Sequence, residues 1–127
     1  MLLLLIAVGG AMGSVARYLV DGWVQSHAGA TFPWGTLVVN VTGTLLLAFL
    51  ARWLEGVAAP PEWRGFVALG FCGAYTTFST FSYETMGLLN GGQSMRAAAY
   101  VGSSVLLSLL SVLVGFRLAA MILGARG

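Results

Sequence analysis

Long apolar stretches separated by short polar connections dominate this chain. A typical hydrocarbon core is about 30 Å thick, and a helix of roughly 20 apolar residues crosses it. Four stretches reach that length, at residues 2–20, 33–54, 64–89 and 96–123. The pattern therefore predicts an all-α integral membrane protein in which residues 1–127 form a single domain with four transmembrane helices.

The third stretch differs from an ordinary membrane helix in its middle. Gly70 and Gly73 weaken a helix there, and the adjacent Thr76 and Thr77 are β-branched residues with low helix propensity. We predict that this helix is broken between Gly73 and Thr77. Because lipid cannot satisfy free carbonyl groups, a break at membrane depth has to line a cavity or lie buried in protein.

Polar side chains also form faces on the second and fourth stretches. Spacings of three or four residues place such side chains on one side of a helix. The faces consist of Thr36, Asn40 and Thr44 on the second stretch and of Tyr100, Ser104, Ser108 and Ser111 on the fourth. Faces of this kind either hydrogen-bond to neighbouring helices or line a polar path through the membrane.

Two ionisable residues and one pair of glycines each allow two interpretations. Glu84 is the one acid predicted at membrane depth, where ionisable residues are functional candidates. Arg17 either extends to the membrane interface or forms an ion pair inside the bundle. Gly9 and Gly13 have the spacing of a close helix-packing face, although chance gives the same spacing in a glycine-rich chain.

Composition and charge exclude several classes of protein. Hydrophobic residues make up 58% of the chain and charged residues only 8%, against about 25% charged residues in soluble domains. A net charge of +2, spread along the chain, does not fit a nucleic-acid-binding surface. One histidine, one cysteine and four acidic residues, all scattered, argue against a catalytic triad or a metal cluster in one subunit. We therefore expect no enzyme.

The arginines give only a weak signal for orientation in the membrane. With four spans, both termini and the 55–63 connection share one side, and that side carries only a small excess of arginine. A weakly biased membrane protein is able to insert in both orientations, and a chain this small does not enclose a pathway alone. We therefore infer a dimer, and the charge count permits an antiparallel one.

Four stretches together carry a resemblance to a known family. They are residues 9–18, residues 33–43, residues 70–84, and the stripe of Tyr100, Ser104 and Ser108. These stretches resemble the Fluc (CrcB) fluoride channels of bacteria, and with the four-span pattern they cover essentially the whole chain. The 70–84 stretch, GFCGAYTTFSTFSYE, is long and specific, whereas the 9–18 motif and the serine stripe alone are weak signals.

The resemblance implies a passive, fluoride-selective channel of the bacterial inner membrane that exports fluoride from the cytoplasm. It implies a dual-topology homodimer, assembled antiparallel, with two pores along the subunit interface. It also implies a structural sodium ion on the dimer axis, held by the backbone carbonyls of Gly73 and Thr76. The implied fluoride path consists of Asn40, Phe78, Phe81, Thr36, Tyr100, Ser104 and Ser108, and the positions of Arg17, Glu84 and Thr77 also match, with structural or accessory roles left open.

The chemistry of these side chains agrees with a fluoride path. Fluoride is small and strongly hydrated, so a pore has to replace the hydrogen bonds of water with amide and hydroxyl donors. Phenylalanine rings present a positive edge that stabilises an anion without a fixed cation. Two rival functions remain: a small dual-topology, proton-coupled exporter that uses Glu84, and a membrane assembly subunit whose polar faces contact only other helices.

Overall fold

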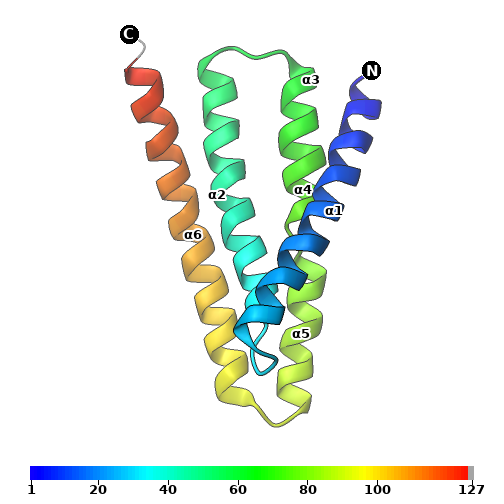
Figure 1. The fold of residues 1–127 in the computed structure, drawn as a ribbon. Helices are drawn as coiled ribbons and strands as arrows, with labels where there is room; N and C mark the ends of the chain where they lie inside the picture. The colour runs from blue at the N-terminus through cyan, green and yellow to red at the C-terminus, as the bar shows by residue number, and fades with distance from the viewer. Residues whose placement is uncertain (126–127) are drawn as a thin grey trace.

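The computed structural model describes residues 1–125, and every regular element among them is helical. Three long helices are each long and apolar enough to cross a membrane: α1 (Leu2–Ala28), α2 (Trp34–Gly56) and α6 (Ser94–Gly124). A fourth path through the bundle is made of shorter elements (Figure 1): α3 (Pro61–Arg64), the π-helix η1 (Gly65–Cys72), α4 (Gly73–Tyr75) and α5 (Phe78–Asn90). The all-α prediction is confirmed.

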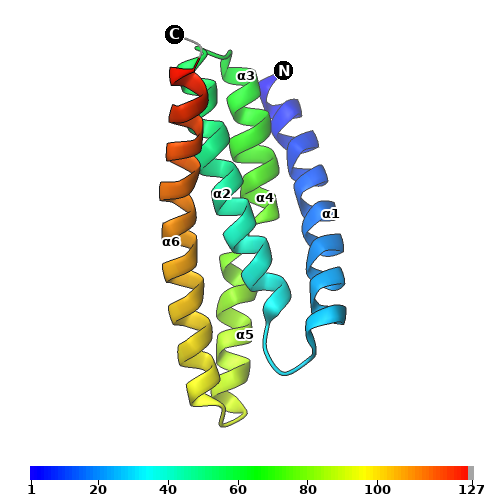
Figure 2. The same cartoon turned by 60° about the vertical axis from the view of Figure 1, so that its left-hand side comes forward.

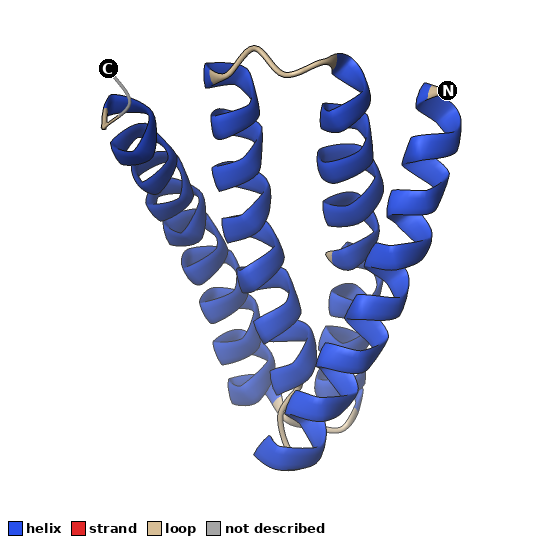
Figure 3. Ribbon diagram, turned by 45° about the horizontal axis from the view of Figure 1, so that its top comes forward, coloured by secondary structure: helices blue, strands red, loops and turns tan. Residues whose placement is uncertain are grey.

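The chain runs up and down the bundle. Both termini and the connection between α2 and α3 lie at one end, while the α1–α2 and α5–α6 connections lie at the other (Figures 1 and 2). Helix α2 makes its most extensive contacts with α6, and α1 makes its own with η1. Figure 3 shows α1 and α6 diverging toward the end that carries the termini. This arrangement matches the predicted order of four spans.

Helix α1 is longer than predicted. The sequence pattern assigned residues 21–32 to a connection, but the helix continues to Ala28. It ends where Gly29 adopts a φ of +95°, in the left-handed region that favours glycine. His27 therefore lies in the last turn of α1, with its Nδ1 2.7 Å from the carbonyl oxygen of Trp23. The other helices begin and end close to the predicted bounds.

Glycine allows α1 and η1 to approach backbone to backbone. Gly9 is buried, and a methyl group at this position would collide with the carbonyl oxygen of Phe66. A methyl group on the equally buried Gly13 would collide with the carbonyl oxygen of Phe71. Facing them on η1, a Cβ at Gly70 would lie 2.7 Å from a carbonyl oxygen of α1. Of the two interpretations of the G-x-x-x-G spacing, the structure supports close helix packing.

Large apolar side chains cover much of the outside of the bundle. Helix α6 exposes an aliphatic surface that includes Leu106, Leu109, Leu110 and Leu113. In a soluble protein an apolar surface of this extent would drive association. On helices long and apolar enough to cross a membrane, a surface of this kind suits contact with lipid.

Candidate functional site

The segment that crosses the bundle between residues 61 and 90 is not helical at two of its residues. Helix α4 ends at Tyr75, and Thr76 adopts an extended conformation with a ψ of 157°. Thr77 is also extended, with φ −149° and ψ 121°, and α5 begins at Phe78. The break therefore lies inside the predicted Gly73–Thr77 interval.

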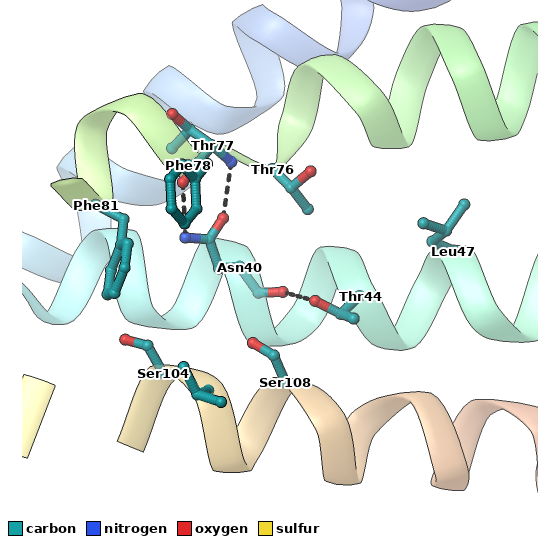
Figure 4. Close-up of a pocket in the computed structure, with 10 residues that line it drawn as sticks. Asn40, Thr44, Leu47, Thr76, Thr77, Phe78, Phe81, Ser104 and Ser108 are labelled. Carbon is teal, nitrogen blue, oxygen red and sulfur yellow. Dashed lines mark hydrogen bonds between the residues drawn. The ribbon is translucent and has the colours of Figure 1, made fainter. Parts of the chain in front are cut away.

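The side chain of Asn40 on α2 pairs with the backbone at this break. The Thr77 N–H donates to Asn40 Oδ1 at 2.8 Å, and Asn40 Nδ2 donates to the Thr77 carbonyl oxygen at 3.0 Å (Figure 4). The amide thus satisfies both backbone groups of Thr77. Its second N–H has no partner among residues 1–125 and remains available as a donor.

The break also changes the hydrogen bonds of two backbone carbonyls. In a continuous α-helix each N–H donates to the carbonyl four residues earlier, so Thr77 would donate to Gly73 and Thr80 to Thr76. Instead the Thr77 N–H donates to Asn40, and the Thr80 N–H donates to Thr77 Oγ1 at 3.2 Å. Gly73 and Thr76 thereby lose their usual helical donors. Gly73 is exposed and Thr76 is half-buried in this chain.

An open groove of about 330 Å³ adjoins the break. Its walls come from α2, from the break and the first turn of α5, and from α6 (Figure 4). The lining residues are Asn40, Thr44, Leu47, Thr76, Thr77, Phe78, Phe81, Ser104, Val105 and Ser108. The groove thus brings together five of the seven residues of the implied fluoride path, and no charged side chain lines it.

Two phenylalanine rings form part of this groove. The centroids of Phe78 and Phe81 lie 5.7 Å apart with an angle of 46° between the rings. Phe81 also packs on the ring of Tyr100 at 5.1 Å. The Phe78 side chain is 79% exposed, so the part of the chain that the structure describes covers little of it. The aromatic wall is therefore open on one side.

The remaining two residues of the implied path, Thr36 and Tyr100, lie at a different site. Thr36 Oγ1 donates to Glu84 Oε1 at 2.9 Å, and the Tyr100 hydroxyl donates to Glu84 Oε2 at 2.6 Å. Thr36 and Tyr100 are buried almost completely. The predicted polar face of α2 is therefore divided: Thr36 contacts Glu84, whereas Asn40 and Thr44 line the groove. On α6, Tyr100 likewise contacts Glu84, whereas Ser104 and Ser108 line the groove.

Two polar atoms inside the bundle have no hydrogen-bond partner within residues 1–125. One is the Ser104 hydroxyl, which is buried at the groove, and the other is Arg17 Nε. Arg17 is half-buried and lines a small cavity together with Thr77 and Thr80. The only ion pair among the described residues joins Arg52 and Glu55, so the structure shows no ion-pair partner for Arg17. Arg17 and the break thus line the same small cavity, and Asp21 lines it as well without forming an ion pair with Arg17.

Sequence reasoning missed several contributors. Thr80 supplies an N–H to the cap at the break, and Leu47 and Val105 add an apolar part to the groove. Gln25 binds the α1–α2 connection, because its Nε2 donates to the carbonyl oxygens of Gly29 and Phe32 and its Oε1 accepts from a backbone N–H of α2. Thr80 had a local signal, since an N-cap threonine three residues earlier is a common pattern. Gln25 had none.

Together the fold and the groove define a class: small helical membrane proteins with an interrupted span beside a groove that holds polar and aromatic side chains but no charged one. The family model described as "CrcB-like protein, Camphor Resistance (CrcB)" matches residues 4–116. The fluoride-specific ion channel FluC of Rhizobium meliloti (strain 1021) is 50% identical over 117 residues, covering 91% of this chain and 94% of the relative. Proteins of the same name from Hahella chejuensis and from a strain of Thermus thermophilus are 45% and 47% identical, each over 122 residues and 95% of this chain. They are covered over 96% and 95% of their own lengths.

The chain therefore belongs to the CrcB family, which confirms the resemblance seen in the sequence. This family consists of ion channels and not of enzymes. The chain is accordingly a multi-pass protein of the bacterial inner membrane.

Proposed function

We propose that this protein is a passive, fluoride-selective channel that allows fluoride to leave the cytoplasm. The observation that carries the proposal is the groove at the break, where hydrogen-bond donors and aromatic rings meet without a charged side chain. The names of its relatives support the choice of fluoride.

The groove offers fluoride several weak partners in place of water. One N–H of Asn40 and the buried Ser104 hydroxyl have no hydrogen-bond partner among the described residues. Ser108 adds a third donor, and Phe78 and Phe81 add ring edges with positive potential. An arginine in this position would attract anions and also retain them, whereas several weak sites let an ion move on. Beyond Phe81, Tyr100 and Thr36 extend the path toward Glu84.

The functional unit that we propose is an antiparallel, dual-topology homodimer with one pore on each side. The open face of the groove and the exposed ring of Phe78 support this proposal, because a second subunit is able to close both. A two-fold axis would make two equivalent pores, since such an interface uses the same surface of each subunit. The weak arginine bias permits both orientations in the membrane.

The same proposal includes a structural sodium ion on the two-fold axis. No cluster of three or more histidine, cysteine, aspartate or glutamate side chains exists among the described residues, so a cation here would rely on backbone oxygen. The carbonyls of Gly73 and Thr76 fit this role, because the donors that a continuous helix would supply are bonded elsewhere. Two carbonyls from each subunit would give the ion four hard oxygen ligands, and the bound ion would contribute a fixed positive charge at the centre of the dimer.

Fluoride efflux from liposomes tests the proposed function. Purified protein is reconstituted into vesicles loaded with potassium fluoride, valinomycin is added, and external fluoride is followed with an electrode. We expect rapid efflux without any proton gradient. Vesicles loaded with potassium chloride and followed with a chloride electrode serve as the selectivity control. A proton-coupled exporter would instead require a proton gradient and lose transport in Glu84→Gln. No fluoride efflux from well-folded protein would refute the channel.

A further inference from the structure

We propose that Asn40 and Thr77 are positioning residues that create the cation site at the break, by withdrawing the helical donors of the two carbonyls that form it. This inference rests on the proposed sodium ion. It assigns to Asn40 a second role besides that of a donor in the fluoride groove.

The bond from the Thr77 N–H to Asn40 Oδ1 has two consequences for the carbonyls. First, it removes the donor that Gly73 would have in a continuous helix. Second, Thr77 N–H and the Thr76 carbonyl belong to one planar trans peptide, in which the two groups point in opposite directions. Holding that N–H against α2 therefore turns the Thr76 carbonyl away from α2. One bond thus releases one proposed ligand and orients the other.

The bond from Asn40 Nδ2 to the Thr77 carbonyl oxygen fixes the next peptide as well. With both of its backbone groups held by one side chain, Thr77 has little freedom to return to helical geometry. The extended φ and ψ of this residue agree with that constraint.

The side chain of Thr77 accepts the hydrogen bond of the second donor, the Thr80 N–H. Its Oγ1 accepts from the Thr80 N–H at 3.2 Å, as an N-cap residue does at the start of α5. In a continuous helix that N–H would bond to the Thr76 carbonyl. Asn40 thus accepts the N–H that would bond the Gly73 carbonyl in a continuous helix, and Thr77 accepts the one that would bond the Thr76 carbonyl. These are the two carbonyls predicted to bind sodium.

Because Asn40 also lines the groove, it links the cation site to the fluoride path. The second N–H of Asn40 and the two atoms that bond Thr77 belong to one planar amide, so a rotation that changes one contact changes the others. A change at Asn40 therefore has to affect cation binding and not only transport.

The test measures sodium binding without using transport. The thermal unfolding midpoint of the purified protein is followed as sodium chloride replaces N-methylglucamine chloride at constant ionic strength, and the half-saturating sodium concentration is recorded. For Asn40→Ala and for Thr77→Val we expect this concentration to rise about tenfold or more, the equivalent of one lost hydrogen bond. Thr77→Ser retains the capping oxygen and is expected to behave like the unmodified protein.

Ser111→Ala serves as the control, since Ser111 is buried on α6 but does not line the groove beside the break. We expect it to leave the sodium response unchanged. If Asn40→Ala and Thr77→Val lower the midpoint in sodium-free buffer but keep the original half-saturating concentration, the two residues are merely structural and the proposal is wrong. If Asn40→Ala does not fold, Thr77→Val decides the question alone. If the unmodified protein shows no sodium response while the same preparation releases fluoride, the sodium site and this proposal both fail and the channel stands.

Discussion

Two polar sites lie within the same apolar bundle, and they differ in how completely their hydrogen bonds are used. At Glu84, the hydroxyls of Thr36 and Tyr100 both donate to the carboxylate, and all three partners are fixed. At the break, the pairing of Asn40 with Thr77 leaves one N–H unused, and the Ser104 hydroxyl has no partner among residues 1–125. Buried polar groups normally find partners because an unpaired one is costly.

The difference indicates what each site is able to do. A carboxylate that already accepts from two buried hydroxyls holds three helices, α2, α5 and α6, in register. Unpaired donors beside an open groove have capacity for a ligand that enters and leaves. The contrast predicts that changes at the first site act chiefly on stability, whereas changes at the second act chiefly on transport.

The largest effect on stability is expected at Glu84. Glu84→Leu leaves the buried hydroxyls of Thr36 and Tyr100 without an acceptor. Each such loss costs about 1–3 kcal/mol, so we expect the free energy of unfolding to fall by about 2–6 kcal/mol. Glu84→Gln keeps one acceptor oxygen, and we expect a loss of about 1 kcal/mol. Denaturant unfolding in detergent measures both. Equal stability of Glu84→Leu and the unmodified protein would contradict the role assigned to this carboxylate.

At Ser104 we expect the opposite pattern, in which stability changes little and fluoride efflux changes more. Its hydroxyl has no partner to lose, so Ser104→Ala is expected to change stability by less than about 0.5 kcal/mol while slowing fluoride efflux severalfold. Ser111→Ala is the matched control, because Ser111 is also buried on α6 but does not line the groove. Equal efflux from the two variants would remove Ser104 from the path.

The smallest effect is expected at Thr44. Its hydroxyl lines the groove but already donates to the Asn40 carbonyl oxygen of its own helix. Thr44→Val conserves shape, so we expect fluoride efflux to fall less than about twofold and stability to change by less than about 0.5 kcal/mol. A large loss of efflux would show that a hydroxyl with an intrahelical partner still serves the ion, and the contrast between used and unused donors would weaken.

Much of the fold was predictable from the sequence because membrane helices depend on local properties. Long apolar runs predicted the helices, and two glycines shortly before a pair of threonines predicted the break. The length of α1 was not predictable from apolarity, because its last turns carry polar residues and continue until Gly29. The π-helical turns of η1 have no evident signal in the sequence.

The site was predictable only in part, because helical spacing gives the face of a residue and not its partner. Thr36, Asn40 and Thr44 share a face, yet about 1.5 Å of rise per residue separates the first from the last by roughly 12 Å. Thr36 consequently reaches Glu84, while the other two reach the groove. The pairing of Asn40 with Thr77 joins residues far apart in sequence, and no periodicity shows it.

A pair of variants on α5 tests whether the groove at the break is the fluoride path. Phe78 and Tyr83 are both large aromatic residues with similar exposure, 79% and 82%, but only Phe78 lines the groove. Fluoride efflux from liposomes is compared for Phe78→Ile and Tyr83→Ile at equal protein density. The account predicts that Phe78→Ile loses about tenfold or more of the efflux rate, consistent with loss of an aromatic contact worth about 1.5 kcal/mol, and that Tyr83→Ile keeps it. Undiminished efflux from Phe78→Ile would contradict it.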